Sequence, residues 1–559
     1  MFILRRVHWK ALVSTIACIA VLAGCSTAKV NDPGTSTSPN ATPAPATEPA
    51  KRGAINVSVY DRGNIPPEEG NWDKNRWVDW INKNGPVDVK YTPVPRWESF
   101  PKFNALLASG SAPDLILEYD ANYRNSWYSQ KLLMPIDEMI DKYSTNYKQI
   151  LEKYPLLRKI GTKEDGKLYE IGRLNVVAPH HRLLIREDWL QKLNLQVPTT
   201  TEELYNVAKA FVNQDPDGNG KKDTFGINLS GVGFSVISHI FGRSIDWAEQ
   251  NGQFVHDWDR LQASVEFQKR LFDDGLVDKD FLTDKNGQKG IQDFMNGKLG
   301  IFAIDSAWFT ISNYETLKKN NPTAKVIPMA LPKSQFGQFS PIISTPVQMV
   351  GVVNAKAKDP KAIMQYIDWM VDPEHASLLK NGIEGTHSQK GSNGCLQPID
   401  TEKNKKELYT DDLNMMRSDL LLGKCAEVYL VNLRPEVPTQ KELLDINLKS
   451  KEIYINKDRP IPSLGYDFLP VLPDDLQAIV KSTSKSNNID KGDIWLKALV
   501  GGTGYTAQQA VKDAKDVWEK AGGKQVDDYY AKWYENNKTK AFSIDDLYKF
   551  AEQSQKELK

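Results

Sequence analysis

The order of apolar and polar positions predicts alternating strands and helices early in the chain. Three stretches rich in Val, Ile and Tyr are expected to be strands: Ile55 to Tyr60, Val87 to Val94 and Asp114 to Tyr119. Helical stretches separate them, at Trp72 to Asn82 and Phe100 to Ala108. Parallel strands need a crossover between them, so this order predicts an α/β fold with a parallel sheet and helices on both faces.

A similar alternation returns after residue 180. Thr200 and Glu203 stand at capping-box spacing, which predicts a helix start. Further strands are expected at Leu183 to Arg186, Thr224 to Leu229, Leu299 to Ile304 and Gln348 to Val353. Further helices are expected at Trp258 to Phe272, Ile291 to Met295 and Asp359 to Met370, and the chain from Gln508 onward is expected to be mainly helical. The 559 residues exceed the roughly 250 to 300 that one core spans, so two or more lobes are expected.

The first 25 residues have the pattern of an export signal. Arg5, Arg6 and Lys10 precede an apolar run from Ala11 to Ala23, which is too short for a membrane span. The run ends in Leu22-Ala23-Gly24-Cys25, which resembles the lipobox of bacterial lipoproteins. Residues 1–24 are therefore expected to be a signal peptide, and Cys25 the lipid anchor to the outer face of the cell membrane. An ordinary signal peptide with a chance cysteine is the alternative.

Residues 25–52 are expected to be a disordered tether. Lys29 to Lys51 consists mostly of Thr, Ser, Pro, Ala and Asn, so burial cannot offset the entropy lost on ordering this segment. The whole chain has 71 basic and 71 acidic residues, and residues 1–24 carry three basic and no acidic ones, which leaves −3 on the remainder. This balance argues against nucleic-acid binding, which needs a net basic face.

Two cysteines remain outside the export segment, which contains Cys18 and Cys25. Cys395 and Cys425 can bridge in an oxidising compartment, or stay as two buried thiols. The sequence leaves this choice open.

The loop Asp215-Pro-Asp-Gly-Asn-Gly-Lys-Lys-Asp223 places oxygen donors at alternate positions, as in the first nine places of an EF-hand. Asp215, Asp217, Asn219 and Asp223 offer side-chain oxygens, and Lys221 its carbonyl. Position twelve is Gly226 in place of a bidentate Glu, so a closing oxygen must come from Thr224, water or elsewhere. We expect a structural Ca²⁺ site, with an Asp/Gly-rich surface turn as the alternative.

Several segments, in this order, resemble the extracellular solute-binding proteins of carbohydrate ABC transporters, in particular the long lipoprotein type of Gram-positive bacteria. They are Ser111 to Ile116, Ile185 to Leu190, Pro198 to Leu204, Asp215 to Gly226, Phe294 to Gly300 and Asn381 to His387. The related alginate-oligosaccharide-binding proteins have a structural calcium loop at the corresponding place.

The resemblance implies a two-lobed periplasmic-binding-protein-like fold of type II, with the ligand in the cleft between the lobes and a helical C-terminal region. Hinge crossings are expected near Pro179 to Arg182 and Ser344 to Gln348. The expected N-terminal lobe is 53–178 plus about 347–400, and the C-terminal lobe is 179–346 plus about 401–559.

A sugar presents hydroxyls and apolar C–H faces, so its site needs carboxylates beside aromatic rings. Trp308 and Asp305 follow one predicted strand, and Glu118 and Asp120 lie at the end of another. The full expected ligand-binding set is Trp308, Asp305, Glu118, Asp120, Asp61, Trp72, Trp127, His181 and Glu384. The alternative for each Trp is packing in the core, and the alternative for each acid is a solvated loop. The pair His180 and His181 can instead be structural or exposed.

These observations predict a monomeric carrier without catalysis that captures an oligosaccharide and delivers it to ABC transporter permease subunits. A surface-anchored carbohydrate-active enzyme is one alternative, and a peptide-binding or sensory lipoprotein is another. No His-Glu-x-x-His, Gly-x-Ser-x-Gly or P-loop motif occurs, and Ser482-Thr-Ser-Lys485 lies in a Ser/Lys-rich stretch where chance matches are common.

Overall fold

The computed structural model describes residues 52–284, 286–427, 431–465, 468–487 and 492–558. The predicted signal segment, Cys25 and the tether up to Lys51 lie outside these ranges. None of the helices in the described ranges combines the length and the apolar character needed to cross a bilayer.

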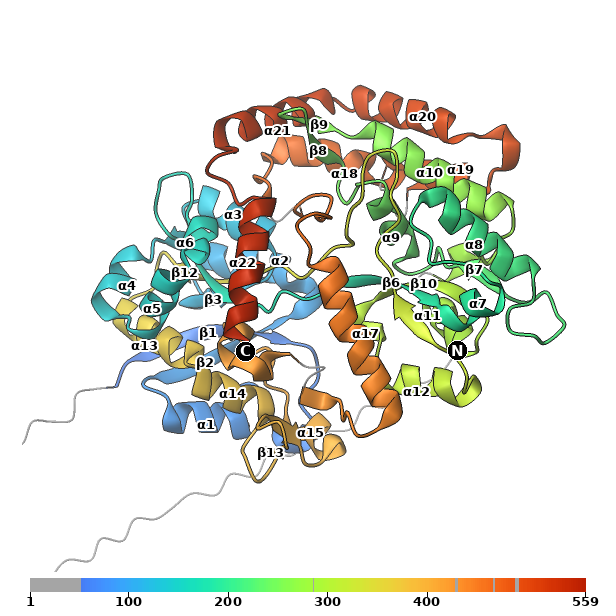
Figure 1. Ribbon diagram of the computed structural model, residues 1–559. Helices are drawn as coiled ribbons and strands as arrows, with labels where there is room; N and C mark the ends of the chain where they lie inside the picture. The colour runs from blue at the N-terminus through green and yellow to red at the C-terminus, as the bar shows by residue number, and fades with distance from the viewer. Residues whose placement is uncertain (1–51, 285, 428–430, 466–467, 488–491, 559) are drawn as a thin grey trace, which may run out of the picture. The chain divides into compact units, whose positions relative to one another are not determined.

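The first sheet has six strands in the order β2-β1-β3-β12-β4, with β5 also paired to β12 (Figure 1). Its strands are β1 (Ala54–Asp61), β2 (Asp88–Pro95), β3 (Leu115–Leu117), β4 (Leu133–Met134), β5 (Glu170–Leu174) and β12 (Val347–Asn354). As predicted, β1 is parallel to β2 and β3. β12 is antiparallel to β3, β4 and β5, so the sheet is mixed and not purely parallel. The chain reaches β12 from the second sheet, and not through a crossover helix from β5.

The second sheet has four strands in the order β11-β6-β10-β7. They are β6 (His181–Arg186), β7 (Phe225–Ile227), β10 (Leu299–Asp305) and β11 (Val326–Pro328). β10 is antiparallel to β6 and parallel to β7. Two hairpins stand apart from the sheets, β8 (Trp247–Gln250) with β9 (Gln253–His256) and β13 (Ser388–Lys390) with β14 (Leu396–Pro398).

Helices surround both sheets. Those along the first part of the chain are α1 (Arg76–Asn84), α2 (Ser99–Ser109), α3 (Ala121–Ser129), α4 (Asp137–Tyr143), α5 (Asn146–Lys153) and α6 (Pro155–Gly161). The middle part contains α7 (Glu187–Lys192), α8 (Thr201–Asn213), α9 (Gly233–Ile240), α10 (Trp258–Asp273), α11 (Gln288–Met295), α12 (Ile311–Asn320), α13 (Pro360–Val371), α14 (Pro373–Asn381) and α15 (Thr401–Glu407). The last part contains α17 (Pro438–Tyr454), α18 (Asp474–Asn487), α19 (Asp493–Val500), α20 (Ala507–Lys520), α21 (Lys524–Asn537) and α22 (Ile544–Glu557).

Local sequence signals explain where several of these helices begin. The capping box predicted at Thr200 is present, with the Thr200 hydroxyl accepting from the Glu203 N–H and the Glu203 carboxylate accepting from the Thr200 N–H. Asp359 caps α13 by accepting from the Ala362 N–H, and Pro360 fills the first helical position. These interactions satisfy N–H groups that have no partner within the helix.

Two crossing segments connect the sheets and pair with one another. The Ser344 N–H donates to the Ala178 carbonyl at 2.8 Å, the Asn175 N–H donates to the Pro346 carbonyl at 2.9 Å, and Pro179 forms a bridge with Ile343. These residues lie in or beside the segments predicted to be hinge crossings. Their pairing makes both crossings part of one antiparallel connection.

Separate apolar cores underlie the two sheets. One core contains side chains from Ile55 to Val177 and from Val347 to Leu379. It continues through Tyr409 to Ala426 and includes Phe550 of α22, whereas we expected the chain to leave this lobe at about residue 400. The α22 helix lies beside this lobe in Figure 1 because its buried face, which includes Leu547 and Phe550, packs into the same core.

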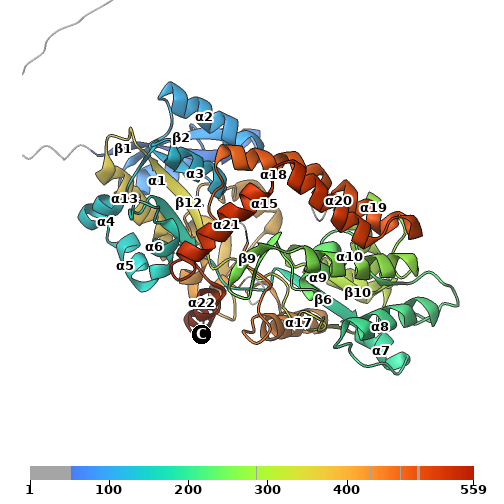
Figure 2. The same ribbon diagram turned by 90° about the horizontal axis from the view of Figure 1, so that it is seen from above.

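The second core contains side chains from Leu183 to Leu331 and extends into the helical C-terminal region. Helices α19 and α20 lie beside α10, as Figure 2 shows, and Trp495 of α19 and Ala510 of α20 are fully buried in this core. Trp518 and Tyr530 are buried with Trp247 of the β8–β9 hairpin. The helical C-terminal region predicted from the sequence is confirmed.

Cys395 and Cys425 form a disulfide with a Cα–Cα distance of 5.4 Å. The bond joins the β13–β14 hairpin to the end of the 3₁₀ segment Asp419–Ala426. The choice that the sequence left open is therefore resolved in favour of the bridge.

Candidate ligand-binding site

Aromatic and arginine side chains gather where strands of the first sheet end. Tyr60 comes from the end of β1, Arg96 directly follows β2 and Tyr119 follows β3. The Tyr60 and Tyr119 rings stack with centroids 5.9 Å apart, and the Arg96 guanidinium lies 4.6 Å from the Tyr60 centroid. The same guanidinium lies 5.4 Å from the ring of Trp97, which is 85% exposed. We call Tyr60, Arg62, Arg96, Trp97, Tyr119 and Arg173 the arginine–aromatic cluster.

The arginines of this cluster differ in how their charge is balanced. Arg62 makes a two-point ion pair with Asp412, at 2.7 and 3.0 Å. Arg173 lies 5.5 Å from the Tyr119 centroid and donates to the Gln348 side-chain oxygen at 2.7 Å and to the Met415 carbonyl at 3.2 Å. Within the described ranges, neither Arg96 nor Arg173 has a carboxylate at ion-pair distance. The cluster therefore presents two cations without a direct anionic partner.

Burial shapes the ionisation of this cluster. It raises the pKa of Tyr60, and the nearby Glu118 carboxylate raises it further, so the phenol stays protonated. Burial also lowers the pKa of Arg173, and Arg417 adds to this effect, although a guanidinium keeps its charge at neutral pH. Cationic guanidinium groups beside uncharged rings are suited to an anionic ligand with apolar faces.

The predicted residues Asp61, Glu118 and Asp120 lie at this edge with different exposure. Glu118 is fully buried, and one of its oxygens accepts from the Asp120 N–H at 2.9 Å. Asp120 caps α3 by accepting from the Asn122 N–H, and Asp61 is exposed and accepts from the Gly63 N–H. Asp61 and Asp120 are therefore the accessible acids of the three.

A second group of predicted residues lies at the end of β10 in the other sheet. Trp308 belongs to the 3₁₀ turn Ser306–Trp308 and is 45% exposed. Asp305 caps this turn by accepting from the Ala307 N–H at 2.7 Å. His181 is paired with Asp305 in the sheet register and is buried, which lowers the pKa of its imidazole to about 4.

The remaining predicted residues lie away from both groups. Trp127 is fully buried, donates to Asn104 at 2.8 Å and meets Phe103 edge-on, so its ring is part of the core. Trp72 is also buried in the core of the first lobe. Glu384 is exposed beside the β13–β14 hairpin, with Lys390 at 4.0 Å.

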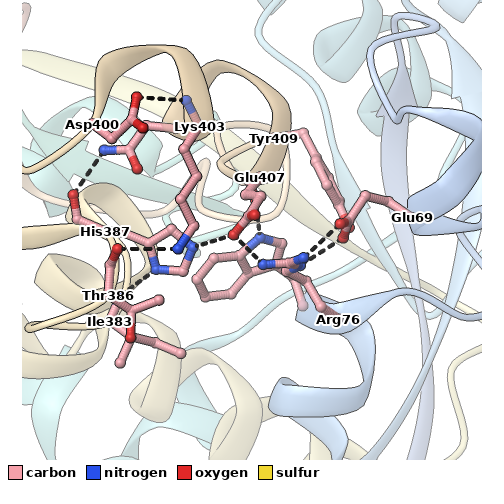
Figure 3. A network of polar contacts seen from close by, with 11 residues as sticks. Glu69, Arg76, Ile383, Thr386, His387, Asp400, Lys403, Glu407 and Tyr409 are labelled. Atoms are coloured by element: carbon pink, nitrogen blue, oxygen red, sulfur yellow. Dashed lines mark hydrogen bonds and ion pairs between the residues drawn. The ribbon is translucent and has the colours of Figure 1, made fainter.

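The segment that contains Glu384 is organised around a buried histidine (Figure 3). The His387 ring accepts from the Ile383 N–H at 3.1 Å, and its other nitrogen lies 3.0 Å from Glu407. Arg76 connects Glu407 to Glu69, and the Trp77 indole donates to the Glu407 carbonyl. This network joins α1, α15 and the hairpin, which gives the Asn381 to His387 segment a structural role.

The predicted calcium loop is exposed and rich in oxygen atoms. Asp215 accepts from the N–H groups of Gly218, Asn219 and Gly220, all at 3.1 Å. The Asn219 amide donates to Asp217 at 2.7 Å and to Asp223 at 3.0 Å, so an N–H₂ group lies between two carboxylates. Burial and the adjacent Asp215 raise the pKa of Asp217. These hard oxygen donors fit calcium if the Asn219 amide turns its oxygen inward.

Two groups beside the loop, the Thr224 hydroxyl and the Lys298 ammonium, bear on which further ligands a calcium ion could find. The Thr224 hydroxyl is buried and donates to the Phe211 carbonyl at 2.7 Å, so it faces α8 and not the loop. Lys298 forms an ion pair with Asp223 at 3.0 Å. The Thr224 hydroxyl is therefore not available as the ligand that closes the calcium site.

Sequence reasoning missed Arg96, Trp97, Tyr119 and Arg173. The rule that selected Glu118 and Asp120, namely position directly after a strand, applies equally to Arg96 and Trp97 after β2. The same rule applies to Tyr119, which lies between Glu118 and Asp120 after β3, so the sequence contained the signal for three of the missed residues. The expected ligand set consists of acids, tryptophans and one histidine, and it contains no arginine.

Two sheets with separate cores, joined by paired crossings, define a two-lobed α/β protein. A family model described as bacterial extracellular solute-binding protein matches residues 74–377. The chain belongs to this family, which confirms the predicted family and fold class.

Relatives and structures support the same assignment. The chain is 27% identical over 482 residues to the polygalacturonan/rhamnogalacturonan-binding protein YtcQ of Bacillus subtilis (strain 168), covering 83% of this chain and 89% of that protein. It is 24% identical to lipoprotein LipO of the same organism, over 83% of this chain and 90% of LipO. A structure of the S. pneumoniae ABC-transporter substrate binding protein FusA, an EF-hand mutant in complex with fructo-nystose, superposes with a TM-score of 0.61 at 19% identity, covering 87% of this chain and 99% of that one.

Proposed function

We propose that this protein binds an oligosaccharide outside the cell and delivers it, unaltered, to the permease subunits of an ABC transporter. The observation that carries this proposal is the arginine–aromatic cluster at the strand ends of the first sheet. Aromatic faces suit the C–H faces of a sugar, and guanidinium groups donate to its oxygen atoms. Membership of the solute-binding family supports a carrier role.

The preferred ligand is an acidic oligosaccharide, one that contains uronate residues. Arg96 and Arg173 have no carboxylate at ion-pair distance among the described residues, and an anionic sugar would supply one. Guanidinium groups match the planar carboxylate of a uronate. The name of the relative YtcQ, a polygalacturonan/rhamnogalacturonan-binding protein, agrees with this class of ligand.

Trp308 of the second sheet contributes a stacking ring to the same ligand, and Asp61, Asp120 and Asp305 contribute acceptors for sugar hydroxyls. Trp308 supports this role because nearly half of its surface is exposed at the end of β10. The paired crossings serve as the hinge, and contacts to both lobes favour a closed state.

The anchor and the calcium loop complete the proposal. Cys25 carries the lipid that holds the protein at the outer face of the membrane, and the relative LipO is itself named a lipoprotein. Asp215, Asp217, Asn219, Lys221 and Asp223 hold a structural Ca²⁺. An EF-hand mutant of the structural neighbour FusA agrees with a loop of this type. The protein works as a monomer and catalyses no reaction.

Calorimetric titration with oligomers of galacturonic acid tests the proposal, with the same oligomers carboxyl-reduced to neutral sugars as the matched control. We expect saturable one-to-one binding of the acidic oligomers, much weaker binding of the reduced ones, and recovery of ligand of unchanged length by chromatography. Shortened products would show that the protein cleaves its ligand and is an enzyme. Preference for the neutral oligomers would overturn the acidic class, and no binding of either would overturn both parts.

A further inference from the structure

Three side chains with metal-binding chemistry converge beside the crossing segments. The Asp305 carboxylate oxygen Oδ2 lies 3.7 Å from His180 Nδ1 and 3.9 Å from His181 Nε2. The three donor atoms all lie within 4.8 Å of one another. In the part of the chain that the structure describes, no other set of three or more His, Cys, Asp or Glu residues is gathered as closely. The calcium loop is therefore a separate feature.

These separations are too long for hydrogen bonds and close to those within a metal site. Ligand atoms about 2.0 to 2.2 Å from a tetrahedral metal ion are roughly 3.3 Å from one another. Small side-chain rotations would therefore bring Asp305, His180 and His181 onto one ion. Two imidazole nitrogens and a carboxylate oxygen suit zinc and similar transition ions, whereas calcium and magnesium prefer oxygen donors.

The surrounding backbone holds the three residues in place. Asp305 Oδ1 accepts from the Ala307 N–H, which leaves Oδ2 directed at the histidines. The Ser306 N–H donates to the His180 carbonyl at 2.8 Å, and the Ser306 hydroxyl donates to the Pro179 carbonyl at 2.6 Å. The donors are therefore preorganised, which reduces the entropy lost on binding an ion.

His181 is the enclosed member of the three residues. Its side chain is 9% exposed, and its ring makes no hydrogen bond to any described residue. The fully enclosed imidazole of His239 lies beside it, with ring centroids 6.0 Å apart. Nε2, which faces Asp305 at 3.9 Å and makes no hydrogen bond, is the nitrogen available to a metal ion, whereas the buried Nδ1 is not one of the converging donors.

We propose that His180, His181 and Asp305 bind a divalent transition-metal ion of the zinc type at the junction of the first crossing and β10. The ion joins the crossing segment to the second sheet. Asp305 Oδ2 then binds the metal instead of the sugar hydroxyl proposed above, and Trp308 remains available for the sugar. This inference stands apart from the proposed function, because metal binding is measured without any oligosaccharide.

Titration of the purified protein, without a polyhistidine tag, with Co²⁺ in the visible range tests the site. An excess of Ca²⁺ keeps the oxygen-rich loop from contributing. We expect one Co²⁺ per chain, with the absorption of a four- or five-coordinate ion, and displacement by one equivalent of Zn²⁺. His180→Ala and Asp305→Asn should each weaken Co²⁺ binding at least tenfold.

His375→Ala is the matched control, since His375 lies on α14, where it contacts the Trp369 carbonyl and Asp372. It should leave Co²⁺ binding unchanged. His180 is half exposed, so His180→Ala should keep the melting temperature of the metal-free protein and remains informative if Asp305→Asn misfolds. Unchanged affinity in a folded His180→Ala variant, or an absorption typical of weak octahedral Co²⁺ only, would overturn the proposal.

Discussion

The guanidinium of Arg96 lies over the ring of Tyr60, 4.6 Å from its centroid. No carboxylate of a described residue lies at ion-pair distance from this cation. Arg270 offers a contrast, because it lies 3.5 Å from the Tyr205 centroid and is also paired with Glu202 at 2.6 Å. The two arginines share an aromatic contact and differ in charge compensation, and the proposed ligand-binding role falls to Arg96 alone.

Arg96→Gln should weaken binding of an acidic oligosaccharide by about 1.5 to 3 kcal/mol, the usual contribution of a hydrogen bond to a charged group. It should also reduce the dependence of the affinity on salt, because one screened charge is lost. Calorimetric titration at two salt concentrations measures both effects. The matched control, Arg270→Gln, should change neither, and equal losses in the two variants would contradict the assignment.

Trp308→Ala should weaken oligosaccharide binding by about 1 to 3 kcal/mol, taking the scale for burial of a large apolar side chain. The ring is 45% exposed without ligand, so its removal should change the melting temperature little. Tyr143→Ala, which removes another exposed aromatic ring at the end of α4, should leave the affinity unchanged. An unaltered titration of Trp308→Ala would remove this residue from the site.

The strand order of the first sheet shows how far sequence patterns extend. Periodicity predicted β1, β2 and β3, because the runs of β1 and β3 are largely buried on both faces and the edge strand β2 alternates buried and exposed residues. It could not predict that β12 enters the same sheet antiparallel. The chain leaves the first lobe near Arg182 and comes back to it only at Val347, more than 150 residues later, so this pairing depends on how the chain returns from the second lobe. Local patterns determine elements, whereas such returns depend on long-range packing.

Two tryptophans of the expected site differ in burial, and the sequence could not predict this difference. Trp308 and Trp127 both follow or lie near strands, yet one is exposed on a 3₁₀ turn and the other is fully buried. Hydropathy alone cannot separate them, because a Trp side chain suits both environments. The position of α22 in the first lobe was missed for a similar reason. Its amphipathic pattern predicts a buried face but not the core that buries it.

Calcium removal should destabilise the protein. A ligand at 100 times its Kd stabilises the folded state by about 2.7 kcal/mol, so a chelator should lower the melting temperature. Asp217→Asn should abolish this response, because Asp217 is one of the two carboxylates next to the Asn219 amide. Asp445→Asn, on the exposed face of α17, should respond to chelator like the wild type. A chelator-insensitive melting temperature in the wild type would exclude a structural ion.

Loss of the disulfide should destabilise the first lobe by about 3.6 kcal/mol in the chain-entropy estimate for a loop of this size. The bond closes 30 residues between the hairpin and the 3₁₀ segment Asp419–Ala426. Cys395→Ser with Cys425→Ser should therefore unfold at lower denaturant concentration, and reductant should lower the midpoint of the wild type but not of the double variant. Two reactive thiols in the unreduced denatured wild type would contradict the bridge.

Acid should destabilise the protein through Glu170. Burial disfavours its charge, but Arg124 and Lys163 outweigh that effect and hold the pKa of the Glu170 carboxyl below its usual value. The unfolded chain then binds the proton first. Stability from this group is complete above about pH 4.3, the ordinary value for Glu, and is lost as the pH falls toward the lower folded pKa.

Glu170→Gln should cost about 3 to 5 kcal/mol at neutral pH, because it leaves two buried cations without their anion. Below about pH 4.3 the variant should lose stability less steeply than the wild type, by at most about 1.4 kcal/mol per pH unit for one proton. Denaturant titrations from pH 7 downward measure both effects. Glu138→Gln, which removes one member of an exposed pair with Lys142 on α4, should behave like the wild type. Parallel acid slopes for Glu170→Gln and the wild type would show that this carboxylate does not control acid stability.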